Sequence, residues 1–359
     1  MSAGALTRRG VLLAITAVSL YLFAPALLEV FGAFDELGEI SPLWFPVMLA
    51  LQIGSYACMW GIQRLAVRAD HWGPVITSQL AANSFGRVVP GGVAAAGAVQ
   101  YAMLVRAGVP AGAAASGMTA SSLLLFGTLL ALPLLTLPAI LGGVAVNPHL
   151  TRAALAGAVL FVFMVAAGVA CVVWDRPLIL VGRATQAIRN RVRRDREPLT
   201  GLPERLLSER DIVLRVLGHE WWEALLLAAG RWLLDYLTLV AALYAVGARP
   251  HVSLVLLAFC TAQLLGTLPI TPGGLGLVEA GLTGTLALAG VGGGAAVVAT
   301  LAYRLVSFWL PIPAGAVAAV VHRRRYGTAE VEPPPLTPTP EPDAASPGPL
   351  AGRSPPTTR

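Results

Sequence analysis

Apolar stretches long enough to cross a bilayer recur along this chain, and they constrain its fold more than any other feature. A helix needs about 20 mainly apolar residues to span the hydrocarbon core. Because backbone polar groups must be paired internally in a bilayer, such stretches predict an all-α polytopic membrane protein with about six transmembrane helices. The six stretches are Gly10 to Ala33, Pro42 to Ala66, Ala111 to Leu141, Leu150 to Trp174, Trp222 to Val246 and Ala295 to Val321.

The composition excludes several classes of protein. Only 12% of the 359 residues are charged and 56% are hydrophobic, whereas about a quarter of the residues of a soluble domain are charged. All 25 basic residues are arginine, so the chain has no lysine for a nucleotide-binding P-loop or a Schiff base. Cys58, Cys171 and Cys260 lie in apolar runs without metal or redox spacing. We therefore predict no metal and no cofactor.

Two further apolar segments, Val75 to Leu104 and Val252 to Ala289, are interrupted by proline and glycine. The second contains the sequence LPITPGGLGLVEAG, which adds a glutamate to these helix breakers. Non-helical backbone at membrane depth occurs where it is buried in protein or lines a wet cavity. We therefore expect two broken, re-entrant helical hairpins in place of plain spans.

The two broken segments resemble each other. When PGG at 90–92 is aligned with PGG at 272–274 without gaps, eleven of the 25 positions from 90 to 114 are identical to their counterparts. Three predicted spans separate the copies, which gives them opposite orientations, as in the inverted repeats of many transporters. In such folds the substrate binds where the broken elements meet. The alternative is the relic of a gene duplication in a membrane scaffold.

The arginines follow the positive-inside rule. Arg8 and Arg9 precede the first span, ten arginines against six acids lie between Asp175 and Gly218, and the loop at 35–39 is acidic. This pattern predicts both termini on the cytoplasmic side of the membrane, with the first span kept as an uncleaved anchor in preference to a signal peptide. The arginine-rich segment fits an amphipathic surface on anionic lipid. Without interleaved aromatic residues it does not indicate nucleic-acid binding.

We divide the chain into a transmembrane domain, 1–325, and a tail, 326–359. The domain contains repeat halves at about 10–141 and 150–321 and a cytoplasmic arginine-rich loop at 175–219. Ten prolines between Glu332 and Arg359 predict a disordered cytoplasmic tail.

Three sequence motifs carry a resemblance to a known family. They are PITPGGLGLVEAGL from Pro269, LAYRLVSFWLP from Leu301, and NSFGRVVPGG from Asn83. Together they resemble the lysylphosphatidylglycerol synthetase transmembrane family, also called flippase-like, over about residues 10 to 322. The resemblance implies paired re-entrant helices, and the best-known members move aminoacylated phosphatidylglycerol across the bacterial membrane.

The chain departs from the family pattern in two respects. Some members carry a soluble aminoacyltransferase domain, and we expect none here because only 38 residues follow Val321. Many members also have a glutamate and an arginine soon after the first proline turn, where this chain has GGVAAAGAVQ. That difference leaves the identity of the substrate open.

Ionisable groups at membrane depth are costly and indicate functional sites. Glu279 either caps a helix that restarts after the second turn or receives a substrate ammonium or a proton. Arg304 pairs with Glu279 or holds a lipid phosphate, and Arg87 contacts a phosphate or anchors its segment at the headgroups. The predicted site for substrate binding and translocation comprises Glu279, Arg304, Arg87, Asn83, Pro272, Gly273, Gly274, Pro90, Gly91, Gly92, Gln263 and Tyr303.

Arg231 and Asp235 are spaced i, i+4 and share one helix face. We interpret them as a structural intramembrane pair that fixes packing. Asn83 and Gln263 are expected to bond backbone groups that the helix breaks leave free. Aromatic residues at the ends of the spans are expected in an interfacial belt, and Tyr303 offers a cation-binding contribution beside Arg304.

These features predict a lipid translocase that moves an anionic or aminoacylated phospholipid, or a lipid-linked headgroup, between leaflets. We expect a transport protein and not an enzyme, because no nucleophile or metal cluster has the required spacing. The alternatives are a non-catalytic scaffold or accessory subunit of a lipid or cell-envelope pathway, and a small-solute secondary carrier. We expect membrane phospholipid as the partner and no binding to nucleic acid. A second copy of the chain, in a homodimer, and a separate lipid-modifying enzyme are further candidate partners.

Overall fold

The computed structural model is helical throughout the residues it describes. These are residues 43–89, 92–136, 173–192, 200–217, 220–267 and 272–327, with scattered positions between 159 and 171. Within them four helical stretches are long and apolar enough to cross a membrane: Trp44–Val67, Ala111–Leu135, Trp221–Ala245 and Gly293–Tyr326. They confirm the second, third, fifth and sixth predicted spans.

The predicted first span, Gly10 to Ala33, lies outside the described residues, as do Pro90, Gly91 and the proline-rich tail. The fourth, Leu150 to Trp174, is described only at scattered positions, which are helical from 166 to 171. The signal-peptide question therefore lies outside the described part of the chain as well.

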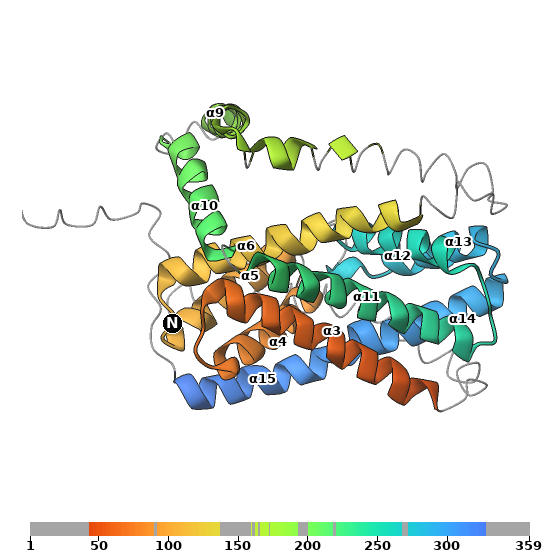
Figure 1. Cartoon of the computed structure of the whole chain (residues 1–359). Helices are drawn as coiled ribbons and strands as arrows, with labels where there is room; N and C mark the ends of the chain where they lie inside the picture. The colour runs from red at the N-terminus through yellow and green to blue at the C-terminus, as the bar shows by residue number, and fades with distance from the viewer. Residues whose placement is uncertain are drawn as a thin grey trace, which may run out of the picture.

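Helices α3 (Trp44–Val67) and α11 (Trp221–Ala245) pack against each other along the bundle (Figure 1). Glycine makes this close approach possible. A Cβ added at Gly54 would lie 3.1 Å from Leu234, and one added at Gly61 would lie 3.0 Å from Leu227. Small residues let membrane helices approach closely enough for van der Waals contact to hold them together.

Each broken segment forms a pair of packed helices. The first pair is α4 (Trp72–Val88) and α5 (Gly92–Arg106), and the second is α12 (Val252–Thr267) and α13 (Leu277–Leu288). In Figure 1 the first pair lies in the left half of the bundle and the second in the right half. All four helices are shorter than the 18 residues required of a candidate span.

The backbone plan of the two pairs recurs in the register that aligns the two PGG turns. Helix α5 ends at Arg106 and α13 at Leu288, and the next helices begin at Ala111 (α6, to Ala131) and Gly293 (α14, to Arg304). Both pairs end in the same left-handed cap. Gly108 has φ 91° and Gly290 has φ 90°, and the residue after each glycine donates to the carbonyl five positions back at 3.1 Å. Such a cap requires a positive φ that glycine adopts without strain.

The last span changes its helical period near its middle. Helix α14 passes into a π turn, η3 (Leu305–Trp309), and then into α15 (Pro311–Tyr326). The N–H of Leu310 donates to the carbonyl of Leu305, the i to i+5 bond of a π turn. Helix α15 packs closely on α4, since a Cβ added at Gly315 would overlap Ser84 and the carbonyl of Leu80. The last span therefore joins the second half of the bundle to the first.

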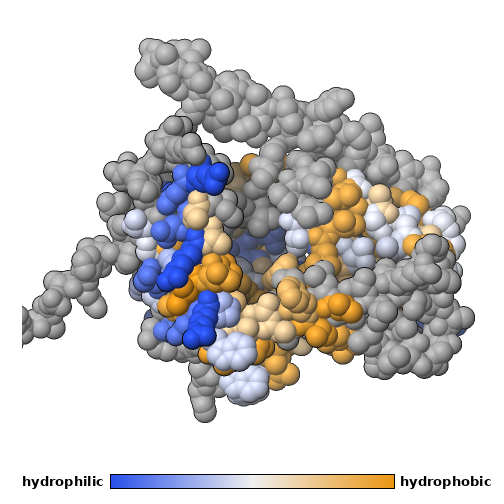
Figure 2. Space-filling view, turned by 90° about the horizontal axis from the view of Figure 1, so that it is seen from above, coloured by the Kyte–Doolittle hydropathy of each residue, from blue (hydrophilic) through white to orange (hydrophobic). Residues whose placement is uncertain are grey.

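Helices α9 (Asp175–Val192) and α10 (Leu202–Leu217) lie beside the bundle, above its left end in Figure 1. Arg210 of α10 pairs with Asp175 of α9 at 2.6 Å. Seen from above, a band of hydrophilic residues covers this end of the molecule (Figure 2). The two helices fit the amphipathic surface segment expected from the arginine-rich sequence.

The largest group of buried apolar side chains lies between α11, α12, α13 and α14. Phe259 is fully buried and its ring contacts Trp232 and Tyr236 edge to face. Trp221 and Trp222, at the start of α11, are 60% and 50% exposed, as an interfacial belt requires. Cys260 is buried, Cys58 and Cys171 are half-buried, and all three are free.

Candidate functional site

Arg87, in the last turn of α4, connects three elements near the centre of the bundle. Its Nε donates to Asn83 Oδ1 at 3.1 Å, and its Nη2 donates to the hydroxyl of Tyr56 in α3 at 2.9 Å. Its Nη1 donates to the backbone carbonyls of Ser307, at 2.9 Å, and of Phe308. Four N–H groups of the guanidinium therefore bind protein groups, of the five that arginine carries.

Two prolines explain why these carbonyls need an outside donor. Pro311 and Pro313 have no N–H, so Ile312 carries the only backbone N–H that could reach either carbonyl in an α or π bond, and it can serve just one of the two. A carbonyl left unpaired in a membrane protein costs several kcal/mol. Arg87 satisfies both groups, and Ser84 Oγ donates to the carbonyl of Pro311 at 2.8 Å. Arg87 therefore bonds to the backbone in the middle of the last span, a contact that the sequence hypotheses did not include.

Glu279 caps a helix, one of the roles that the sequence offered for it, and also pairs with Arg304. Its Oε2 accepts the N–H of Gly276 at 2.8 Å, which caps the start of α13. Its Oε1 accepts Nε of Arg304 at 2.6 Å. The side chains are 17% and 9% exposed, so the pair is largely withdrawn from solvent.

Arg304 also contacts the turn that precedes α13. Its Nη2 lies 3.4 Å from the carbonyl of Gly273, and its guanidinium lies 4.0 Å from the centre of the Phe308 ring. Arg87 approaches the same ring at 5.0 Å, and a Cβ added at Gly273 would lie 2.5 Å from that ring and 3.1 Å from the carbonyl of Arg87. The second break and the end of α4 therefore meet at Phe308. No hydrogen bond joins Nη1 of Arg304 to the described residues.

Arg231 and Asp235 form the predicted pair, 2.9 Å apart. Asp235 also accepts Gln263 Nε2 and the Tyr303 hydroxyl, each at 3.2 Å, while Arg231 donates to Ser55 Oγ at 2.6 Å. The pair is thus part of a network that includes two residues predicted for the site, Gln263 and Tyr303. The sequence interpretation had kept the pair separate from that site.

The three groups of polar residues border one enclosed cavity of about 90 Å³. Three arginines and one aspartate line it, so its wall is electropositive. Gln52 also lines this cavity and is 4% exposed, and its Oε1 has no hydrogen-bond partner among the residues that the structure describes. The charged and polar lining residues are Gln52, Arg87, Arg231, Asp235, Gln263, Tyr303, Arg304 and Ser307.

A second cavity, of about 410 Å³, adjoins the first, because Arg87, Gln263, Arg304 and Phe308 line both. It lies among α4, α5, α6 and α12 and adds several polar groups, namely Gln79, Asn83, Gln100, Ser122 and Thr267. Figure 2 shows a hollow near the middle of the upper face with hydrophilic side chains in its depth. The two cavities bring polar side chains to the point where the two helix pairs meet.

The structure brings most of the predicted site together. Glu279, Arg304, Arg87, Gln263 and Tyr303 lie in the networks above, and Asn83 bonds to both Arg87 and Tyr56. Gly273 and Gly274 have φ 59° and 74°, Pro272 begins a short 3-10 turn, η2 (Pro272–Gly274), and Gly92 lines the larger cavity. Among the described residues no three His, Cys, Asp or Glu side chains form a metal-binding group.

The sequence interpretation missed the contribution of α3. Gln52, Ser55 and Tyr56 all reach the central networks or cavity from this mainly apolar helix. Their spacing of three and four residues puts them on one helix face, which was the available signal. Phe308 was missed because its role depends on the two arginines that flank it.

Comparison with known proteins gives the family. The family model described as "Lysylphosphatidylglycerol synthase TM region" matches residues 10–315. The chain belongs to this family. The resemblance seen in the sequence is confirmed.

Two curated proteins of Methanothermobacter thermautotrophicus, each described as "UPF0104 membrane protein", are also similar. One is 32% identical over 99 residues, which is 28% of this chain and 28% of the relative. The other is 35% identical over 86 residues, 24% of this chain and 26% of the relative. The matches therefore span about a quarter of the length of these relatives. No solved structure matches the chain significantly.

Proposed function

We propose that this protein moves a phospholipid with an anionic or aminoacylated headgroup, or a related lipid-linked headgroup, between the leaflets of a bacterial plasma membrane. The observation that carries the proposal is the pair of adjoining polar cavities at the meeting point of the two broken helix pairs. Arginine suits a phosphate because its planar fork donates two parallel hydrogen bonds. An electropositive cavity at membrane depth fits a phosphate headgroup better than an apolar or cationic ligand.

We further propose that the helix pairs are re-entrant hairpins related by an inverted repeat. The matching caps at Gly108 and Gly290, the common register of the two segments and the placement of the pairs in opposite halves of the bundle support this arrangement. Both termini would then lie in the cytoplasm, in agreement with the arginine distribution. Alternating access in such folds comes from one repeat moving against the other around a fixed site.

Arg304 is the arginine best placed to receive the phosphate. It lines both cavities and keeps Nη1 without a bond to the described residues, whereas Arg87 uses four of its N–H groups on protein. A phosphate bound to Arg304 would compete with Glu279 for the guanidinium. Glu279 would then be free to accept a proton or a substrate ammonium, which gives the pair a direct part in transport.

The test is movement of fluorescent lipids in proteoliposomes, followed by their accessibility to a membrane-impermeant quencher. Phosphatidylglycerol, an aminoacylated phosphatidylglycerol and a polyprenyl phosphate would be compared in the protein and in the variants Glu279→Gln and Arg304→Ala. Glu204→Gln and Arg249→Gln, which change exposed residues outside the cavities, are the matched controls. We expect movement of at least one lipid, its loss in both site variants and its retention in both controls.

Absence of movement for every lipid would contradict the proposal and favour a scaffold or a small-solute carrier. Movement that survives both site variants would instead place the path elsewhere. Vesicle uptake of soluble anions without lipid movement would identify the solute carrier. We also propose that no enzymatic step is involved, which predicts that each lipid is recovered chemically unchanged after the assay.

A further inference from the structure

A groove of about 600 Å³ lies at the end of the bundle, away from the central cavities, between the last turns of α3 and the first turns of α11. Gly61 and Leu227 touch at its apolar end, and Ala57 and Leu65 continue that lining. The opposite end of the groove is charged, with Arg64, Arg68, Glu220 and Glu223 at its rim. Its polarity therefore changes along its length from apolar to charged, as the polarity of a phospholipid does.

Aromatic side chains place this rim at a membrane interface. Trp72 lines the groove and is 45% exposed, and Trp221 and Trp222 are exposed at the same end of α11. Exposed tryptophan at the ends of membrane-spanning helices is typical of the headgroup level. Helices α3 and α11 are both candidate spans, so the groove opens where headgroups lie.

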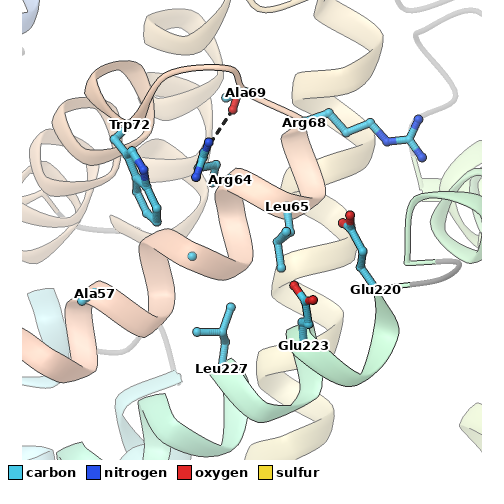
Figure 3. A pocket seen from close by; sticks show the side chains of 10 residues that line it. Ala57, Arg64, Leu65, Arg68, Ala69, Trp72, Glu220, Glu223 and Leu227 are labelled. Atoms are coloured by element: carbon cyan, nitrogen blue, oxygen red, sulfur yellow. Dashed lines mark hydrogen bonds between the residues drawn. The ribbon is translucent and has the colours of Figure 1, made fainter.

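The two walls of the groove carry opposite charges. Arg64 comes from α3, where its Nε donates to the carbonyl of Ala69 at 3.3 Å and its guanidinium lies 4.6 Å from the Trp72 ring. Figure 3 shows the carboxylates of Glu220 and Glu223 pointing from α11 toward the end of α3. Neither carboxylate forms a hydrogen bond or an ion pair with any residue that the structure describes, and the Nη groups of Arg64 form none either. Because the Nη groups of Arg64 and the two carboxylates do not bond to each other, the charged groups on both walls can bind a ligand.

We propose that this groove binds the headgroup of an amine-bearing phospholipid, with the phosphate on Arg64, the ammonium on Glu220 and Glu223, and the acyl chains along Ala57, Gly61 and Leu227. The acidic side chains of Glu220 and Glu223 together with Arg64 suit a zwitterion, which carries an ammonium and a phosphate, in contrast to the electropositive central cavity. Charge-assisted hydrogen bonds are the strong ones in such recognition. The proposal goes beyond translocation and does not depend on it, because binding here requires no movement between leaflets.

The test is equilibrium binding to the purified full chain in detergent, read from tryptophan fluorescence. The probes are dihexanoyl-phosphatidylethanolamine, dihexanoyl-phosphatidylglycerol, soluble glycerophosphoethanolamine and inorganic phosphate. We expect the ethanolamine lipid to bind about tenfold more tightly than the glycerol lipid, the effect of one charge-assisted hydrogen bond. The two soluble probes should bind at least tenfold more weakly than the ethanolamine lipid, because they lack acyl chains.

Single substitutions test the basic and the acidic wall of the groove one at a time. Glu223→Gln should lower affinity for the ethanolamine lipid about tenfold and leave the glycerol lipid unchanged, whereas Arg64→Gln should weaken both lipids. Glu220→Gln, at an exposed position whose side chain makes no cap bond, is a second test of the acidic wall, and Glu204→Gln and Arg249→Gln should change nothing. Equal affinity for the two lipids, or a preference that survives both glutamate variants, would overturn the proposal. Equal affinity for glycerophosphoethanolamine would overturn the lipid part and assign the groove to a soluble phosphoamine.

Discussion

The helix pairs α4–α5 and α12–α13 share a backbone plan but stabilise their breaks with different side chains. When the two PGG turns are aligned, Glu279 of the second pair corresponds to Gly97 of the first. The second pair therefore has a carboxylate that accepts backbone N–H and Arg304, while the first has Arg87, which donates to the carbonyls of η3. One pair supplies an acceptor to its own turn, and the other supplies donors to the last span.

This difference separates a fixed element from one that can change partners. Arg87 donates to the carbonyls of Ser307 and Phe308, which Pro311 and Pro313 deprive of backbone donors, so we expect its bonds to be structural. The ion pair of Glu279 and Arg304 joins the carboxylate that caps α13 to an arginine that lines both cavities, where a bound anion could replace the carboxylate. We expect substitutions in the first pair to affect stability most, and substitutions of the ion pair to affect transport most.

The largest effect is expected at the contact between α4 and α5. A Cβ added at Gly92 would overlap the backbone of Gly86, and backbone atoms cannot move aside as a side-chain end can. We expect Gly92→Ala to cost more than about 3 kcal/mol, measured as the loss of folded protein and a lower Tm in detergent.

Two glycines provide controls for that prediction. A Cβ at Gly97 meets nothing within 4 Å, so Gly97→Ala in the middle of α5 should raise stability by about 0.5–1 kcal/mol. In the second pair, a Cβ at Gly281 meets chiefly the flexible end of Leu265, so Gly281→Ala should cost less than Gly92→Ala. Equal Tm values for Gly92→Ala and Gly281→Ala would show that the two pairs are equally tolerant and would remove the contrast.

The next effect concerns Arg87. Arg87→Ala leaves the carbonyls of Ser307 and Phe308 and the side chains of Asn83 and Tyr56 without their donor. We expect a loss of about 3–5 kcal/mol, as for breaking other buried charged interactions. Thermal unfolding in detergent measures it, with Arg106→Ala, an exposed arginine at the end of α5, as the control that should change little. A Tm shift no larger than that of Arg106→Ala would mean that Arg87 does not hold the last span.

A double-mutant cycle tests whether Glu279 and Arg304 stabilise the protein as a pair. Glu279→Gln and Arg304→Gln should each cost about 2–3 kcal/mol, since each leaves one charge without its partner. The double variant should cost at least about 1 kcal/mol less than the sum, because the neutral pair leaves no buried charge. Additive losses in Tm would indicate that the two side chains act independently.

The sequence predicted the membrane class, four of the spans and the meeting of Glu279 with Arg304, because length, hydropathy and a shared motif report on these features directly. It did not predict the role of Arg87, since that role depends on a long-range contact between α4 and η3. The prolines of FWLPIP did signal carbonyls in need of a donor, but the sequence does not say which helix provides it. The polar face of α3 was overlooked for the same reason, because Gln52, Ser55 and Tyr56 acquire partners only across the bundle.

The smallest effect is expected at Tyr303, whose hydroxyl donates to Asp235 at 3.2 Å and accepts from Gln263 at 3.0 Å. Tyr303→Phe keeps the ring in place and removes these bonds, while Asp235 retains Arg231 and Gln263, so the cost should be about 1 kcal/mol. Tyr244→Phe, on the exposed face of α11, is the matched control and should leave the Tm unchanged. A loss of stability several times larger would mean that the Asp235 network, and not the ion pair of Glu279 and Arg304, holds the second half of the site together. The contrast between a fixed first helix pair and an exchangeable second helix pair would then have to be abandoned.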